Sequence, residues 1–147
     1  MSRKEQPPQT KEEILQNLVM ENRMLEGAIS ELQARIGLVD QAIREFNVTD
    51  TTLMSLKDLK KNDEILVPIG GGSYLKARLS ETEKVMASIG GGVTSEKTAD
   101  DTKSLVESQL NEFQKVRSAL QNQVIQAAQR IEIVRGEVGK LAGQPKP

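Results

Sequence analysis

The residues that come nearest to a chemical motif are two glycine triplets, Gly70–Gly72 and Gly90–Gly92, each directly after an isoleucine. A glycine-rich loop that binds nucleotide phosphates is followed by a Lys-Ser/Thr pair and opens a helix. Neither GGGSY nor GGGVT contains that pair, which disfavours a phosphate loop. The triplets are typical of tight turns instead, because glycine adopts positive φ without a steric penalty.

Acidic pairs are the other candidates for chemistry, at Glu12–Glu13 and Asp100–Asp101. Both stand where a helix is expected to begin, and the helix dipole favours carboxylates there without any catalytic role. The chain has no Cys and no His, so thiol chemistry, the usual zinc ligand sets and the commonest general base are missing. The sequence therefore predicts a protein that is not an enzyme and uses no metal and no cofactor.

The composition of this chain of 147 residues, with 2% aromatic and 37% hydrophobic residues, suits an elongated body better than a globular core. Its 20 basic and 21 acidic residues are interspersed, so no basic surface for nucleic acid is expected. No run of about 18 apolar residues and no signal peptide is found, which predicts a soluble cytoplasmic protein without a membrane span. Residues 1–10 are predicted to be a disordered lead and residues 143–147 a flexible tail.

Two long segments, residues 11–63 and 98–142, are rich in Glu, Gln, Lys, Leu and Ile and carry a seven-residue apolar repeat. Asn22 and Arg117 are the polar residues that interrupt the two repeats. So strict a repeat predicts coiled-coil helices, because the apolar face of an ordinary helix drifts at 3.6 residues per turn. The segment between them is long enough for the second helix to return beside the first, which predicts an antiparallel pair.

The helix ends also carry signals. Thr10 is the expected N-cap of the first helix, and Thr98 or Asp100 is that of the second. The poor helix formers from Thr49 to Thr52 predict an interruption of the first helix, with a kink or a change of register.

One antiparallel register pairs apolar residues along the whole length of the two helices. The paired apolar residues form the seam of the coiled coil. This register joins Ile43 with Phe113 and places Asn22 against Val134. An Asn in such a seam lowers stability and fixes the alignment, or else takes part in binding; both interpretations stay open.

The middle segment, residues 64–97, alternates apolar and polar residues and predicts four strands in two hairpins, with the glycine triplets as turns. Isolated two-stranded hairpins are only marginally stable in water, so these hairpins are expected to pack against hairpins of other subunits. The predicted fold is α+β: a long antiparallel two-helix coiled coil joined by two β-hairpins that form an oligomerisation β-barrel. The residues expected to build that barrel are Ile65, Val67, Ile69, Leu75, Ala77, Leu79, Val85, Ala87, Ile89 and Val93.

Some apolar residues fall outside the seam and cluster near the helix ends that carry the termini: Val19, Met20, Met24 and Ile133. Scattered apolar residues are normal on protein surfaces. A mobile surface that contains Met also suits loose binding of many apolar partners, because Met is flexible and polarizable.

The order helix, ILVPIGGGSYLKARL, turn, VMASIGGGV, helix closely resembles the alpha-type subunit of prefoldin. The family's V-P-(V/I)-G-x-G-S turn is found at Val67–Ser73, and its (S/A)-(V/I)-G-x-G turn at Ser88–Gly92. The flanking helices match only in their heptads and length. Two hairpins rather than one indicate the alpha type.

The resemblance implies an ATP-independent cochaperone, in which two alpha-type and four beta-type subunits form a hexamer with coiled-coil arms. Such proteins bind unfolded or nascent polypeptides with the arm ends and deliver them to a group II chaperonin. The client-binding residues would then be Ile14, Val19, Met20, Met24, Ile133 and Val138, of which Val138 also belongs to the seam. The alternative is a structural prefoldin-like protein that forms filaments or scaffolds; an RNA-binding helical arm is disfavoured by the near-neutral helices.

Overall fold

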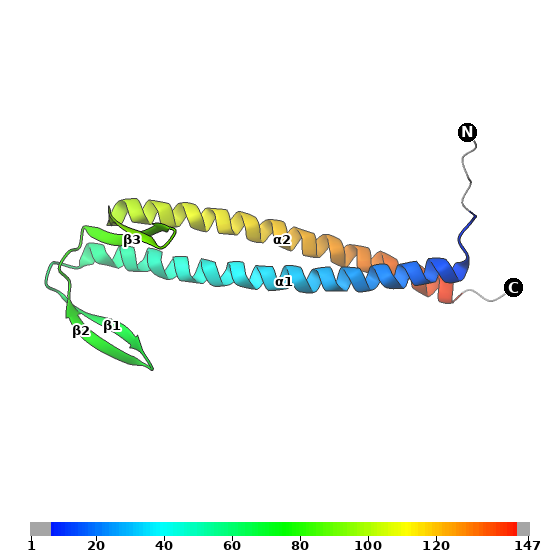
Figure 1. Cartoon of the computed structure of the whole chain (residues 1–147), viewed down its shortest axis with the longest axis horizontal. Coiled ribbons are helices and arrows are strands. Elements are labelled where there is room, and N and C mark those ends of the chain that lie inside the picture. The colour runs from blue at the N-terminus through cyan, green and yellow to red at the C-terminus, as the bar shows by residue number, and fades with distance from the viewer. Residues whose placement is uncertain (1–6, 144–147) are drawn as a thin grey trace, which may run out of the picture. The chain divides into compact units, whose positions relative to one another are not determined.

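The computed structural model describes residues 7–143, except for the side chain of Ile89, and shows two long helices and two β-hairpins (Figure 1). The elements in chain order are α1 (Lys11–Ser55), the short 3-10 helix η1 (Leu56–Asp58), β1 (Glu64–Gly70), β2 (Ser73–Arg78), β3 (Lys84–Gly90), β4 (Val93–Thr98) and α2 (Ala99–Ala142). The predicted order of a helix, two hairpins and a helix is confirmed. Residues 1–6 of the predicted lead and 144–147 of the predicted tail lie outside the described residues.

Both long helices begin at a threonine cap. The Thr10 hydroxyl accepts a hydrogen bond from the Glu13 N–H (3.2 Å), and the Glu13 carboxylate accepts one from the Thr10 N–H (3.4 Å). This reciprocal capping box satisfies two amides that the first turn of α1 leaves unpaired. At α2 the Thr98 hydroxyl accepts from the Asp101 N–H (3.1 Å). Of the two predicted caps of the second helix, Thr98 is therefore the one used.

The expected break in the first helix at Thr49–Thr52 is wrong, because α1 runs unbroken through these residues to Ser55; a kink or a change of register there stays a prediction. The Thr49 hydroxyl donates to the carbonyl of Glu45 (3.1 Å), and the Thr52 hydroxyl to that of Val48 (2.8 Å). A threonine hydroxyl that donates to a carbonyl of the preceding turn has its hydrogen bond within the helix and does not need a partner outside it. Residues that are poor helix formers in isolation are thus accommodated here.

The first helix nevertheless ends earlier than residue 63, the predicted boundary. After η1, Asn62 adopts a positive φ of 73°, a conformation that Asn tolerates. The Asn62 N–H donates to the Leu79 carbonyl (2.7 Å), and the Leu79 N–H donates to the Asp63 carbonyl (3.0 Å). These two bonds close the base of the first hairpin, and they take residues 62–63 away from the helix.

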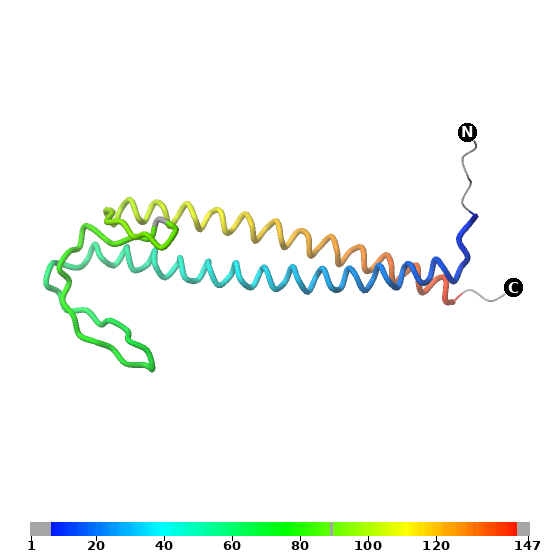
Figure 2. Tube along the Cα trace, in the orientation of Figure 1, coloured from blue at the N-terminus to red at the C-terminus, as the bar shows by residue number. Residues whose placement is uncertain are grey.

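Each hairpin is an antiparallel pair of strands with a glycine turn, as the traces in Figure 2 show. The two central turn residues are Gly71 and Gly72 in the first hairpin, with φ of 60° and 74°, and Gly91 and Gly92 in the second, with φ of 61° and 74°. Positive φ at both central residues defines the hairpin turn that matches the twist of the strands. The prediction that the triplets are turns is confirmed.

The hairpins form two separate sheets, β1 with β2 and β3 with β4. In the first, Ile65 lies opposite Ala77 and Val67 opposite Leu75, so the predicted apolar residues of the two strands share one face. Among residues 7–143 there is no closed sheet. The prediction that hairpins of several subunits close a β-barrel stays a prediction.

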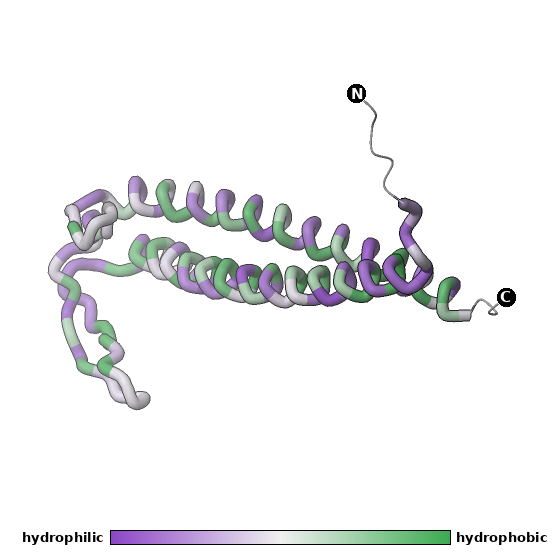
Figure 3. The backbone as a smooth tube through the Cα atoms, turned by 45° about the vertical axis from the view of Figure 1, so that its right-hand side comes forward, coloured by the Kyte–Doolittle hydropathy of each residue, from purple (hydrophilic) through white to green (hydrophobic). Residues whose placement is uncertain are grey.

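The chain divides into two compact units, residues 1–39 with 116–147 as unit 1 and residues 40–115 as unit 2. In unit 1 the two helix segments run in opposite directions, and every predicted seam position from Leu15 to Val39 and from Arg117 to Leu141 is buried or partly buried. Val134 is completely buried, with 0% of its surface exposed. Figure 3 shows the matching pattern, in which hydrophobic and hydrophilic stretches alternate along each helix. The heptad prediction is confirmed.

In unit 2 the helices are joined by an aromatic contact and by apolar seam residues. The rings of Phe46 and Phe113 meet edge to face, with centroids 5.2 Å apart, and Ile43, Leu53 and Val106 are buried. Hairpin β3–β4 borders the same helices, since its residues and those of α1 and α2 line one hollow of about 640 Å³. The second hairpin thus lies beside the helical part of its own unit.

Candidate functional site

Four apolar side chains predicted to lie outside the seam are exposed in unit 1: Val19 (37%), Met20 (61%), Met24 (73%) and Ile133 (53%). Met20 and Met24 are four residues apart and therefore project from the same side of α1. Ile133 is contributed by α2. Apolar surface left uncovered in a helix pair, and rich in flexible Met, suits contact with apolar groups of another molecule.

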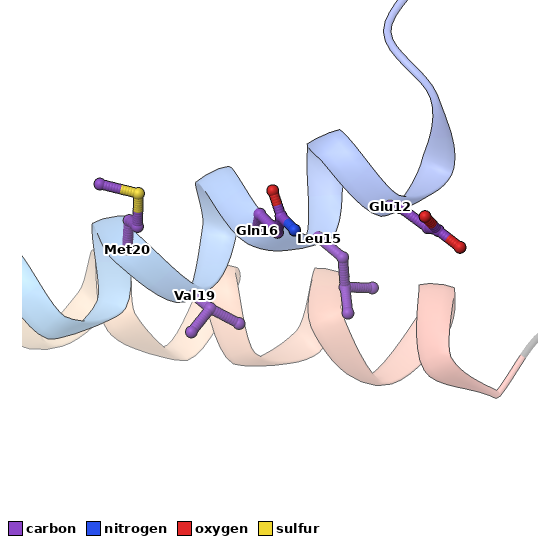
Figure 4. Close-up of a pocket in the computed structure, with 5 residues that line it drawn as sticks. All are labelled: Glu12, Leu15, Gln16, Val19 and Met20. Carbon is purple, nitrogen blue, oxygen red and sulfur yellow. The ribbon is translucent and has the colours of Figure 1, made fainter.

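A hollow of about 450 Å³ lies at the first turns of α1, lined by Glu12, Leu15, Gln16, Val19 and Met20 (Figure 4). Leu15 and Val19 project from one side of α1 in this view, and Met20 projects from the other. The Glu12 carboxylate lies at the end of the hollow nearest the start of α1. The hollow thus combines apolar walls with one acidic group.

A second hollow, of about 280 Å³, lies between the helices of unit 1 and is lined by Val19, Asn22, Arg23, Glu26, Val134, Arg135 and Val138. Val19 borders both hollows. The two depressions are therefore neighbours along α1. An apolar segment laid over Val19 would reach both.

Two ion pairs join the helices next to these hollows. Arg130 donates to Glu21 through Nε (2.6 Å) and through a terminal nitrogen (3.1 Å), and Arg135 donates to Glu26 (3.1 Å). The hydrogen bond from Arg130 lowers the pKa of the Glu21 carboxyl and raises the pKa of the Arg130 guanidinium. Both side chains of this pair are more than one third exposed, so the pair directs the alignment of the helices more than it stabilises them.

Asn22 occupies a seam position and has only half of its amide satisfied. Its Nδ2 donates to the Glu26 carboxylate (3.3 Å), whereas its Oδ1 is buried and has no partner among the described residues. Val134, the residue that the predicted register places against it, lines the same hollow. The buried oxygen is an acceptor that lacks a donor.

The structure brings some of the predicted client-binding residues together and leaves others apart. Val19 and Met20 share the first hollow, and Val19 and Val138 share the second. Ile14 is partly buried and lines neither hollow. Met24 and Ile133 are exposed but also lie outside both. A role in binding for all six residues stays a prediction.

The predicted assembly residues divide into exposed and partly covered groups. Val67, Ile69, Leu75 and Val93 are exposed, whereas Ile65, Ala77, Leu79, Val85 and Ala87 are partly covered; the side chain of Ile89 is not among those described. The sequence analysis missed the large apolar side chains on the opposite faces, Leu66, Tyr74 and Met86, all of which are exposed. The sequence does indicate such side chains, because apolar residues occupy consecutive positions at Ile65–Val67 and Val85–Ala87, and consecutive residues of a strand point to opposite faces.

Two further properties apply to residues 7–143. No helix in this range is long and apolar enough to cross a membrane. Nor do the side chains of the same range form a group of three or more acidic residues that could hold a metal ion.

Comparisons with known proteins agree on one family. The family model for the prefoldin subunit matches residues 25–142. The chain is 32% identical over 110 residues to prefoldin subunit alpha of Methanopyrus kandleri, covering 75% of this chain and 70% of that protein. It is 30% identical over 123 residues to the putative prefoldin subunit alpha of Aquifex aeolicus, covering 82% and 83%.

Among solved structures, the chain is similar to one in filamentous PFD from Methanocaldococcus jannaschii, determined by cryo-EM. The TM-score is 0.69 at 24% sequence identity, and the match covers 80% of this chain and 98% of that chain. At this identity the similarity shows a shared fold.

Proposed function

This chain belongs to the prefoldin family, as a subunit of the alpha type, and on that premise we propose that it is an ATP-independent cochaperone. In this proposal the subunit acts in the cytoplasm, binds unfolded or nascent polypeptides and delivers them to a group II chaperonin. The observation that carries the proposal is the exposed apolar surface of unit 1, where Met20, Met24 and Ile133 are uncovered. An unfolded chain presents apolar side chains in no fixed arrangement, and flexible Met side chains adapt to such partners.

The proposed assembly partners are beta-type prefoldin subunits, four with two copies of this chain. Hairpin β1–β2 supports this part of the proposal, because Leu75 on one face and Leu66 and Tyr74 on the other are exposed. A two-stranded hairpin with both faces uncovered is marginally stable in water and has free strand edges. Pairing with hairpins of other subunits, in a β-barrel, would cover the strand edges and the face that points into the barrel.

A second candidate function is a structural role, in which the chain builds filaments or scaffolds and serves no clients. It is favoured by one observation, that one solved structure of similar fold is a filamentous PFD. Mixing the purified chain with a beta-type subunit and measuring particle mass distinguishes the two. A closed hexamer supports the cochaperone, and open-ended polymers support the structural role.

Client binding is tested by changing Met20, Met24 and Ile133 together to Ser. The variant is expected to lose most of its ability to suppress the aggregation of reduced, unfolded lysozyme, because the uncovered apolar surface is removed. The hexamer is expected to keep its mass, since these residues lie in unit 1 and the hairpins lie in unit 2.

The matched control replaces three other exposed apolar residues of unit 1 by Ser: Leu38, Val116 and Ile125. These residues lie farther along the helices from the ends that carry the termini than Met20, Met24 and Ile133 do, so suppression is expected to persist. Equal suppression by the two triple variants and the unmodified chain would show that clients bind elsewhere.

A further inference from the structure

The two hairpins of unit 2 differ in how far one face is covered. In β3–β4 the partly covered residues alternate with exposed ones, so they share one face of the hairpin: Val85, Ala87, Ser95 and Lys97. At the corresponding positions of β1–β2, Val67 and Leu75 are exposed. Cross-strand neighbours are present in both hairpins and do not explain the difference. The covered face of β3–β4 is therefore the one turned toward the helices of unit 2.

This covered face does not pack closely on the helices. Ala87 and Lys97 of the hairpin and the Phe46/Phe113 pair of the helices line the hollow of about 640 Å³ in unit 2. Leu105 lines it from α2 and is still 52% exposed. Close-packed protein interiors leave few voids larger than a water molecule. The contact is thus incomplete, and it has room for side chains of another molecule.

Lys97 brings a positive charge to this hollow. Among residues 7–143 two lysines are partly covered, Lys97 and Lys103. Lys103 donates to the Glu107 carboxylate (2.6 Å), whereas Lys97 has no ion pair and no side-chain hydrogen bond within the described part of the chain. A covered ammonium loses hydration, and a carboxylate compensates for that loss. The molecule that fills the hollow is therefore expected to carry an acidic group beside an apolar one.

The free hairpin of a second copy of this chain does not match that chemistry. Hairpin β1–β2 offers exposed apolar residues, but the one acidic residue of residues 64–78 is Glu64, at the base of the hairpin. Its carboxylate also lies 4.0 Å from the ammonium of Lys76. No carboxylate is thus available near the glycine turn. A chain of different sequence supplies the missing acid better.

From these observations we propose that the hollow of unit 2 is a docking site for a beta-type subunit. The partner inserts an apolar side chain beside Phe46 and Phe113 and places a carboxylate at Lys97. Ala87 lines the hollow and is also one of the residues expected to build the assembly barrel, so the docking site adjoins the proposed assembly surface. The inference rests on the proposed assembly with beta-type subunits, and it adds a contact in which the helices take part.

The first variant tests the charge. Lys97→Met keeps an apolar stem of similar length and removes the ammonium, so the carboxylate of the partner would lose its cation. The association constant with a beta-type subunit should fall about 30-fold, the lower end of the effect of removing one member of a covered charge pair. Particle mass over a dilution series of the full-length chains measures it. The matched control is Lys84→Met, the same change at an exposed position of the same hairpin, which should alter association less than about twofold.

The second variant fills the hollow. Ala87→Phe adds a ring for which the hollow has space, so the isolated chain should keep its unfolding temperature. The ring takes the place of the partner's apolar side chain, and association should weaken about tenfold, the order expected when a packed contact must take an extra group. The matched control is Thr94→Phe, which adds the same ring to the exposed face of the hairpin. It should not weaken association.

The outcomes separate the inference from the function on which it rests. If the unmodified chain assembles with no beta-type subunit, the proposed assembly fails, and the inference fails with it. If the unmodified chain assembles, and Lys97→Met and Ala87→Phe assemble as tightly, the inference alone is overturned. If the two variants weaken only the self-association of the chain without a beta-type subunit, the hollow binds a second copy, which also overturns it. Weaker assembly in both variants and in neither control supports the docking site.

Discussion

Replacing Leu75 and Val67 together by Ala is expected to weaken assembly with beta-type subunits while leaving the isolated chain folded. The two residues are cross-strand partners on one face of hairpin β1–β2, and 56% and 39% of their surfaces are exposed in the single chain. They are therefore available for burial against another subunit, and they contribute little to the packing of their own chain.

The magnitude follows from the exposed fractions. Burying a whole Leu or Val side chain contributes about 1.5–3 kcal/mol, so covering the exposed parts of these two contributes about 1.5–2.5 kcal/mol per hairpin. At about 1.4 kcal/mol for each factor of ten, the association constant should fall between about 10-fold and 60-fold. The free energy of unfolding of the isolated chain should change by less than about 0.5 kcal/mol, the usual range for exposed positions.

The assay is particle mass measured over a dilution series of the chain mixed with a beta-type subunit. The control carries Leu66→Ala and Tyr74→Ala, which remove exposed apolar side chains from the opposite face of the same hairpin. If the control dissociates at higher concentration than the Leu75/Val67 variant, the opposite face carries the assembly, and Leu75 and Val67 are not its main contacts. If neither differs from the unmodified chain, the hairpin is not an assembly element.

Three further predictions concern single contacts. Thr10→Ala removes the cap of α1 and should lower the stability of the helix by about 1 kcal/mol, seen as faster amide exchange in the first turn, while Thr10→Ser should not. Gly71→Ala places a side chain at a φ of 60° and should destabilise hairpin β1–β2 by about 1 kcal/mol, whereas Gly71→Asn should be tolerated; thermal unfolding and particle mass report both. The bond to Arg130 lowers the pKa of Glu21 below its ordinary 4.5, so its stabilising contribution is present above pH 4.5 and is lost as the pH falls through the lowered pKa. Glu21→Gln should remove that part of the dependence of the free energy of unfolding on pH. A pH dependence identical to that of the unmodified chain would contradict this prediction.

The helices and turns could be predicted because their signals are local and periodic. A heptad repeat fixes which residues meet, and the seam from Leu15 to Val39 is buried or partly buried as expected. The glycine triplets fixed the turns, since two adjacent residues with positive φ are readily supplied only by glycine. The boundary at residue 63 was wrong, because the chain leaves α1 through η1 after Ser55 and residues 62–63 bond to Leu79, a contact that is distant in the sequence.

The candidate site was predictable in position but not in detail. Exposure of Met20 and Met24 follows from their places outside the heptad seam. The half-satisfied amide of Asn22 depends on the rotamers of Asn22 and Glu26, and a sequence pattern does not contain rotamers. The faces of the hairpins were predicted only in part, because Leu66 and Tyr74 make the second face of β1–β2 apolar as well.

The pairing of unit 1 also sets the order in which the chain can fold during synthesis. Glu21 and Arg130 are 109 residues apart, and at about 5–20 residues per second the ribosome takes about 5–20 s to make the interval between them. Unit 2 pairs residues that are much closer in sequence, such as Phe46 with Phe113, and its local hairpins can form first. Throughout that interval the apolar stripe of α1 in unit 1 has no helix to pair with. The nascent subunit therefore exposes, for several seconds, the same kind of apolar surface that its proposed clients present.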